Sequence, residues 1–308
     1  MQIDHPSPPP EGCISCEVRG HVLLIGINRP AKRNGWTPPM FRQLAEAYTR
    51  LDDDPQLRVG VLHAFGDHFT AGLDLPSVAP LMQRGERAVP DGLVDPNDLG
   101  MPRYRRRTKP MVVAVKGITF TVGIELMLAA DIVVAASDCR FSQLEVKRGI
   151  MATGGATLRM AERAGVGNAL LHLLSADVFD SAEALRCNFV QRVVPRPELL
   201  DATLALARQI AAQAEGLRQE LAQLQDSLSG RLRLGVIPTG LTAVATLTAA
   251  FARRHPRVDI EVRSMSTQQI LAGLDSFELD GGVAYLESAT PNHTALPLWR
   301  EKDRKSTR

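Results

Sequence analysis

The chain is poor in cysteine, in aromatic residues and in net charge, and each shortage excludes a class of protein. Its 308 residues include four cysteines, 5% of them are aromatic, and the formal net charge is +2. Four irregularly spaced cysteines do not make the disulfide framework of a small secreted domain, so we expect a reducing, cytoplasmic location. A nearly neutral chain with only short basic runs is not expected to bind nucleic acid.

Long apolar runs are missing as well. Glu125 and Asp131 interrupt the best candidate segment, which stays short of the ~18 residues that a membrane span requires. Residues 1–13 are rich in proline and have neither a basic region nor an apolar core, which predicts a disordered tail rather than a signal peptide. We therefore expect no membrane partner.

Metal ligands do not occur at the usual spacings. Cys13 and Cys16 form a C-x-x-C pair, whereas Cys139 and Cys187 are isolated. No two histidines have ligand spacing, so a tetrahedral zinc site would lack its second half. The sequence predicts no metal.

Strand-like and helix-like segments alternate along the first two hundred residues. The predicted strands lie near 14–28, 58–64, 111–116 and 131–136, and the predicted helices near 40–51, 182–187 and 199–214. The strands at 111–116 and 131–136 are continuous apolar runs, as in sheets covered on both faces. The fold class is therefore α/β, with a layered core.

Two glutamates are the strongest chemical signal. Glu125 lies in the apolar segment AVKGITFTVGIELMLAAD, and Glu145 lies in CRFSQLEVKRGIMATGGATLRM. Burial raises the pKa of a carboxyl group and a neighbouring carboxylate raises it further, so such a pair can exchange protons near neutral pH. On spacing alone, the simpler interpretation is favoured, with Glu125 as a helix N-terminal acid and Glu145 as an exposed loop acid.

The sequence around these glutamates, together with segments upstream, resembles that of a known family. The matching segments are the run of Ile25 to Pro30 with Asn34, the stretch Phe69 to Leu75, residues 114–117 and 121–126, and residues 141–145 followed by Gly149, Gly154 and Gly155. Over residues 14–213 the chain resembles the enoyl-CoA hydratase/isomerase (crotonase) superfamily. The resemblance implies a superhelix of β-β-α turns, with an acyl-CoA thioester as substrate and no cofactor beyond it.

The resemblance also implies roles for individual residues. The backbone amides of Ala71 and Val122 would form an oxyanion hole for the thioester oxygen, where fixed donors stabilise the developing negative charge. Glu125 would orient and deprotonate water, and Glu145 would exchange the proton at Cα. Substrate would be bound by residues of these two loops, namely Ala71, Gly72, Leu73, Asp74 and Val122.

Having both glutamates favours hydration over double-bond migration, because the family's isomerases generally use the position of Glu145 alone. An isomerase and an inactive acyl-CoA-binding protein remain the alternatives. Val122 stands where the family usually has glycine, which puts substrate choice in doubt more than catalysis. The basic run from Arg103 to Lys109 is either a solvated face or a contact for CoA phosphates.

After residue 213 a different resemblance begins. Residues 214–230 look like the linker helix, and residues 231–300 like the opening part of the effector-binding domain, of a LysR-type transcriptional regulator; residues 301–308 make a polar tail. No winged helix-turn-helix is present, and the effector cleft would be incomplete.

Apolar residues keep helical spacing across the junction, so one continuous helix of about 30 residues could run to Ser229 and Gly230. This apolar face could pair with another chain. By resemblance we expect a homo-oligomer, either a trimer or a dimer of trimers.

Overall fold

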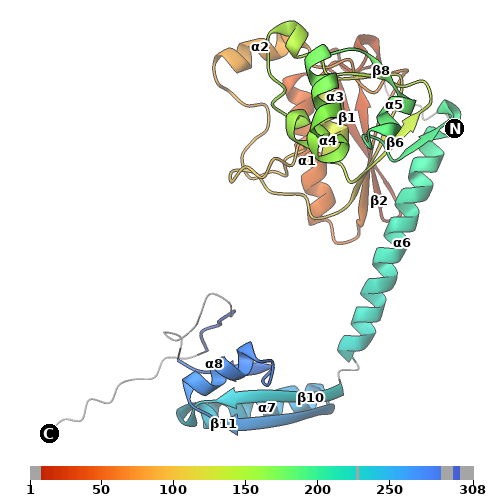
Figure 1. The fold of residues 1–308 in the computed structure, drawn as a ribbon. Coiled ribbons are helices and arrows are strands. Elements are labelled where there is room, and N and C mark those ends of the chain that lie inside the picture. The colour runs from red at the N-terminus through yellow and green to blue at the C-terminus, as the bar shows by residue number, and fades with distance from the viewer. Residues whose placement is uncertain (1–7, 227–228, 286–293, 299–308) are drawn as a thin grey trace. The chain divides into compact units, whose positions relative to one another are not determined.

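The computed structural model describes residues 8–226, 229–285 and 294–298. The chain divides into two compact units, Met1–Gly216 and Leu217–Arg308 (Figure 1). Residues 1–7 of the predicted tail, and the predicted polar tail 301–308, lie outside the described residues. Among the described helices, none combines the length and apolar character that crossing a membrane would take.

A six-stranded sheet forms the centre of the first unit, with the strand order β1-β2-β3-β4-β6-β9. Its strands are β1 (Cys13–Arg19), β2 (Val22–Asn28), β3 (Val59–Ala64), β4 (Met111–Val115), β6 (Ile132–Ala136) and β9 (Arg192–Val194). Only the β1–β2 pair is antiparallel. Every residue of β2, β3 and β4 is buried, as continuous apolar runs predict. The predicted strands in this region are confirmed.

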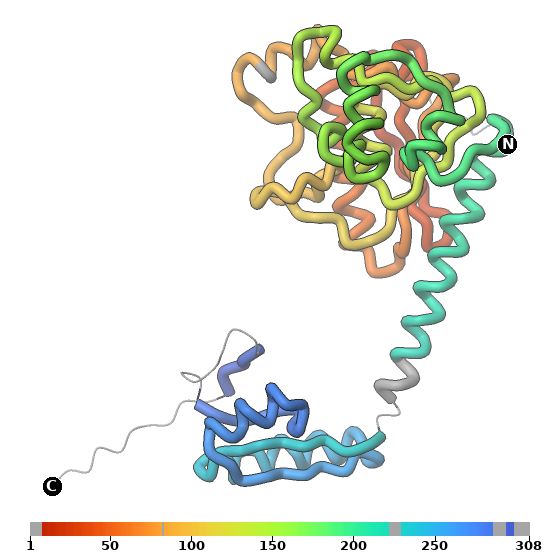
Figure 2. The backbone as a smooth tube through the Cα atoms, viewed as in Figure 1, coloured from red at the N-terminus to blue at the C-terminus, as the bar shows by residue number. Residues whose placement is uncertain are grey.

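A smaller sheet and six α-helices complete the fold around this centre. The smaller sheet has the order β5-β7-β8, with β5 (Ile118–Phe120), β7 (Arg140–Ser142) and β8 (Phe179–Asp180). The helices are α1 (Pro38–Asp53), α2 (Leu75–Gln83), α3 (Val122–Ala129), α4 (Ala156–Ser175), α5 (Ser181–Arg186) and α6 (Leu199–Asp226), with short 3-10 turns η1 (Pro30–Lys32), η2 (Val146–Arg148) and η3 (Arg196–Glu198). Helix α1 buries Met40, Leu44 and Leu51, which confirms the helix predicted at 40–51. Helices α3 and α4 contact each other (Figure 2).

Helix α6 runs uninterrupted for 28 residues through the predicted junction at 213–214. Its first part buries Leu204, Ala207 and Ala211, and Glu215 forms an ion pair with Arg58 at 2.8 Å. Ser229 and Gly230 belong to the following strand, β10 (Ser229–Val236), where glycine allows a φ of +123°. The side chains of residues 222–228 lie outside the described residues, so the far end of the predicted apolar face does too.

The second unit alternates strands and helices. After β10 come η4 (Pro238–Gly240), α7 (Leu241–Arg254), β11 (Arg257–Ser264), α8 (Thr267–Asp275) and β12 (Gly281–Val283). The three strands are parallel, in the order β11-β10-β12. The buried core is small: Ile237, Ile270 and Leu279 form one cluster, and Val236 and Val244 are buried as well.

Candidate active site

Two loops of the first unit lie against each other and position the predicted site. Thr70 pairs with Thr119 in a parallel bridge, in which the Thr70 amide donates to the Ile118 carbonyl at 3.0 Å. Gly72 has a φ of +113°, and a Cβ there would come within 2.5 Å of the Thr121 hydroxyl oxygen. Only glycine permits both this backbone conformation and this close approach. The loop that follows Thr70 therefore packs on the start of α3.

Glu125 lies in the first turn of α3 and is 7% exposed. One of its carboxylate oxygens, Oε1, accepts a hydrogen bond from the Gly154 amide at 2.6 Å. Burial raises the pKa of Glu125, although the amides of Gly154 and Ala156 and the charge of Arg159 oppose the shift. A carboxylate held in this way is both desolvated and fixed in orientation.

Glu145 follows β7 and is the residue before the 3-10 turn η2. Its Oε1 atom accepts a hydrogen bond from the side-chain Nε2 of Gln143 at 3.0 Å, while its Oε2 atom is buried with no partner among the described residues. Burial, with a further contribution from the charge of Glu125, raises the pKa of Glu145 to about 7. The fold thus brings the two glutamates close enough for one charge to change the other's protonation.

The first oxyanion-hole donor needs a correction. The Ala71 amide donates to the Arg33 carbonyl at 2.9 Å, so it is already engaged and does not face the site. The residues on either side of Leu73 bond to Trp36. The Trp36 amide donates to the Gly72 carbonyl, and the Trp36 carbonyl accepts from the Asp74 amide, both at 2.9 Å. Successive amides of an extended segment point to opposite sides, so the Leu73 amide points away from Trp36.

The Leu73 amide has no hydrogen-bond partner among the described residues. The amide of Val122, the first residue of α3, also has no partner among the described residues, because amides at a helix N-terminus lack intrahelical acceptors. The structure therefore offers Leu73 and Val122, rather than Ala71 and Val122, as neighbouring free donors.

Asp74 has a structural partner. Its carboxylate pairs with Arg29, whose guanidinium also donates to the Gly35 carbonyl at 3.0 Å. Asn34, buried nearby, donates to the Phe65 and His68 carbonyls at 2.9 and 2.8 Å. These bonds fix the shape of the loop that carries Leu73, so the Asp74 carboxylate stabilises this loop.

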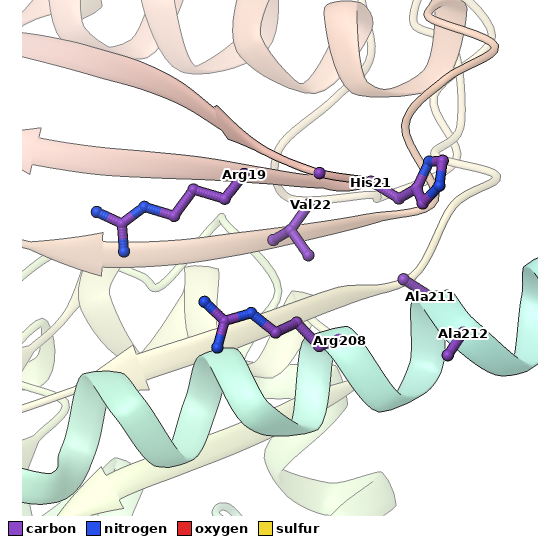
Figure 3. A pocket seen from close by; sticks show the side chains of 7 residues that line it. Arg19, His21, Val22, Arg208, Ala211 and Ala212 are labelled. Atoms are coloured by element: carbon purple, nitrogen blue, oxygen red, sulfur yellow. The ribbon is translucent and has the colours of Figure 1, made fainter.

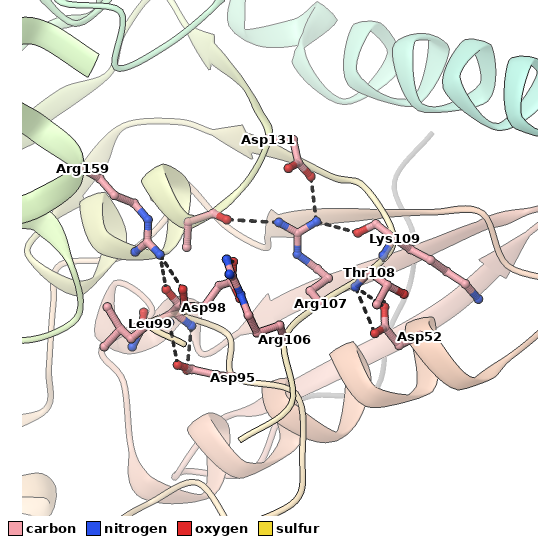
Figure 4. Close-up of polar contacts among 12 residues, drawn as sticks. Asp52, Asp95, Asp98, Leu99, Arg106, Arg107, Thr108, Lys109, Asp131 and Arg159 are labelled. Carbon is pink, nitrogen blue, oxygen red and sulfur yellow. Dashed lines mark hydrogen bonds and ion pairs between the residues drawn. The ribbon is translucent and has the colours of Figure 1, made fainter. Parts of the chain in front are cut away.

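Four of the five cations in the predicted basic run make contacts within the chain, and those of Arg107 can be followed in Figure 4. Arg105, Arg106 and Arg107 pair with Asp53, Asp98 and Asp131, and Lys109 donates to the Leu51 and Asp54 carbonyls. These cations hold a long connection against α1 and the end of α3. The alternative of a phosphate contact through them is therefore disfavoured.

Arg159, on α4, is a site residue that spacing alone did not reveal. Its Nη2 atom donates to the Asn97 and Asp98 carbonyls at 2.6 and 3.0 Å (Figure 4). Leu99 and the guanidinium both lie where a side chain at Gly155 would be, next to the glycine that contacts Glu125. The Gly154–Gly155 pair before α4 was the available signal, because paired glycines mark close approach of a side chain to the backbone.

A hollow of about 520 Å³ lies elsewhere on this unit, between the β1–β2 turn and α6 (Figure 3). It is lined by Arg19, Gly20, His21, Val22, Arg208, Ala211 and Ala212. None of these is a predicted site residue. The chemistry of the glutamates, rather than the size of this hollow, identifies the candidate site.

Comparison with known proteins agrees with this geometry. The sequence model of the family described as Enoyl-CoA hydratase/isomerase matches residues 17–266. Enoyl-CoA hydratase EchA19 of Mycobacterium tuberculosis is 34% identical over 197 residues, which cover 64% of this chain and 73% of that protein. Mevalonyl-coenzyme A hydratase sidH of Aspergillus fumigatus is 33% identical over 204 residues, covering 66% and 74%.

A solved structure gives the same picture. The crystal structure of a probable enoyl-CoA hydratase/isomerase from Mycobacterium abscessus has a TM-score of 0.62 and 37% identity, covering 86% of this chain and 95% of that one. The crotonase-like α/β fold is thereby confirmed. These comparisons give no support to the predicted likeness of residues 215–301 to a LysR-type regulator, and the family match itself continues to residue 266.

Proposed function

Since the chain belongs to the enoyl-CoA hydratase/isomerase family, we propose that it adds water across the double bond of an α,β-unsaturated acyl-CoA thioester. The observation that carries this proposal is the pair of carboxylates formed by buried Glu125, held by the Gly154 amide, and half-buried Glu145, whose Oε2 has no partner among the described residues. Hydration needs one group to take a proton from water and another to deliver a proton to carbon. Two carboxylates whose protonation is coupled meet both needs.

The proposed division of labour follows from their surroundings. Glu125, oriented by the Gly154 amide, holds the water and removes its proton as the oxygen bonds to Cβ. Glu145, with a pKa of about 7, is partly protonated at neutral pH and delivers its proton to Cα. The pair ends with its proton shifted from Glu145 to Glu125, and exchange with solvent restores the starting state.

Negative charge develops on the thioester oxygen during this step. We assign its stabilisation to the backbone amides of Leu73 and Val122, which have no other acceptor among the described residues. One preorganised donor of this kind contributes about 3–4 kcal/mol to the transition state. Gly72 would then bind substrate indirectly, by letting the Leu73 loop approach α3. No cofactor beyond the substrate is part of this proposal.

Crotonyl-CoA tests the reaction. Hydration removes the conjugated thioester absorbance and yields a 3-hydroxyacyl-CoA, whereas the alternative isomerase would move the double bond and yield no hydroxyl group. Identification of the product by mass distinguishes the two. Tight acyl-CoA binding without turnover of any enoyl-CoA would overturn the hydratase proposal in favour of an inactive binding protein.

Further proposals concern the whole chain. We retain a cytoplasmic homo-oligomer, either a trimer or a dimer of trimers, which sedimentation velocity would test. We also retain the division into a domain at 14–213, a linker helix at 214–230 and a LysR-like fragment at 231–300. The alternation of parallel strands and helices in the second unit supports that fragment, and the family match to residue 266 counts against it.

A further inference from the structure

A second cluster of chemically reactive side chains lies where α4 ends and α5 follows. It consists of His172 on α4, Glu183 on α5 and Cys187, the residue that caps α5. The hydratase proposal uses none of them. One nitrogen, one oxygen and one sulfur atom from these side chains all lie within 4.8 Å of one another.

The spacing of the three atoms suits a metal ion. The His172 Nε2 atom is 3.1 Å from Glu183 Oε1, Cys187 Sγ is 3.5 Å from the same oxygen, and Sγ is 3.9 Å from Nε2. Zinc bonds to these ligand types are about 2.0–2.3 Å long, which puts tetrahedral ligands roughly 3.3–3.7 Å apart. The three observed separations scatter around that range, so an ion could enter with little movement.

Burial and neighbouring contacts orient the cluster. His172 is 5% exposed and Cys187 is 1% exposed. The imidazole ring packs on Phe179, with ring centroids 4.2 Å apart. The second oxygen of Glu183 accepts from the Arg186 Nε atom at 2.6 Å, leaving Oε1 facing the imidazole and the thiol. A ligating carboxylate is commonly held by such an outer partner.

Two contacts of Arg186 oppose metal binding. Its Nη2 atom donates to Glu183 Oε1 at 2.7 Å and to Cys187 Sγ at 3.4 Å, so the guanidinium satisfies both ligand atoms without a metal. The Arg186 side chain is 56% exposed. Its Nη2 atom already donates to Asn168 Oδ1 at 3.1 Å, so it can keep that bond and leave Glu183 Oε1 and Cys187 Sγ to the ion while Nε keeps its bond to Oε2.

We propose that His172, Glu183 and Cys187 form a binding site for a zinc-like divalent ion. A thiolate, an imidazole and one carboxylate oxygen would occupy three positions, and water the fourth. The thiol proton is released to solvent as the metal–sulfur bond forms. The ion would join α5 to α4 and stabilise this edge of the fold, apart from the acid–base glutamates.

The test uses cobalt(II) as a spectroscopic probe and zinc(II) as its competitor, on the full chain freed of metal with EDTA. Because Cys13 and Cys16 are a second thiol pair, the background variant is Cys13→Ser with Cys16→Ser. We expect a thiolate-to-cobalt charge-transfer absorption that zinc abolishes, and an increase in Tm on adding zinc. Cys187→Ser and His172→Gln should each lower the apparent affinity at least 10-fold.

Cys139→Ser is the matched control, since Cys139 is also buried but its thiol contacts the Val115 carbonyl. It should leave the absorption unchanged. Glu183→Gln, at a less buried position, provides a variant if Cys187→Ser does not fold. The proposal is overturned if the background variant shows no charge-transfer absorption, or if the absorption survives Cys187→Ser. Enoyl-CoA hydration is a separate measurement, so failure here leaves the hydratase proposal intact.

Discussion

The two units of the chain differ most in what their interiors can hold. The first unit buries three whole strands and large side chains such as Trp36, Phe69 and Phe141, all at 0% exposure. Among the described residues, the second buries five apolar side chains, none larger than leucine, and leaves Leu247 and Phe277 at 51% and 83% exposure. Removing a carboxylate from water requires many packed atoms around it. The first unit provides them, and burial there raises the pKa of Glu145 to about 7.

The largest expected effect comes from removing either proton-transfer group. Glu125→Gln and Glu145→Gln should each lower kcat for hydration by about 10²-fold or more, since a positioned acid or base contributes about 10²–10⁴-fold. Because both act in the same proton-transfer step, the double variant should lose much less than the product of the two factors. Near wild-type hydration by folded Glu145→Gln would show that the proposed mechanism is wrong.

A smaller loss is expected at Arg159, which bonds the 97–98 backbone rather than the substrate. Arg159→Met removes two charge-assisted hydrogen bonds and should cost about 1.5–3 kcal/mol of unfolding free energy. We also expect kcat/KM to fall about 10-fold, or about 1.4 kcal/mol, because the loop next to Gly155 and Glu125 loosens.

Arg163→Met is the matched control for this position. Arg163, one turn further along α4, likewise donates to two carbonyls, those of Leu128 and Ala130 at 3.2 and 2.8 Å. Equal losses of kcat/KM in both variants would show that Arg159 affects catalysis through stability alone.

The raised pKa of Glu145 also predicts how stability depends on pH. An unfolded glutamate has a pKa of about 4.3, whereas folded Glu145 has a pKa of about 7. The unfolded chain therefore loses this proton first, and the native state loses stability as the pH rises through that interval.

Glu145→Gln removes this penalty. Its Tm should exceed the wild-type Tm at pH 8, and the difference should shrink toward pH 5. The exposed Glu162, on α4, provides the control variant Glu162→Gln. A Tm difference that is independent of pH would contradict the proposed burial of the ionised carboxylate.

The smallest effect on chemistry is expected from deleting the second unit's sheet. Truncation after Ser229 should leave kcat/KM unchanged and improve solubility, because that unit exposes apolar side chains and contributes no predicted acid or base. Truncation near Leu204 should instead damage α6, whose buried residues Leu204 and Ala207 pack on the first unit's core. Loss of turnover after truncation at Ser229 would show that residues 231–300 contribute to catalysis.

Much of the fold of the first unit could be predicted because its signals are local. The apolar runs that became β4 and β6, and the helical face of α1, are properties of neighbouring residues. The same is true of the glutamates and of the glycines that mark the site loops. What failed was the identity of one donor, since the motif around Gly72 suggested the Ala71 amide.

The sequence by itself therefore determined the elements, the candidate acid–base pair and the family, since periodicity and motif need only adjacent residues. The tertiary structure decided which amide is free, because the acceptor for Ala71 is Arg33, far back along the chain. It also decided that His172, Glu183 and Cys187 meet, although their spacing in the chain fits no metal motif. Hydrogen-bond partners, burial and shifted pKa values all depend on residues brought together only by folding.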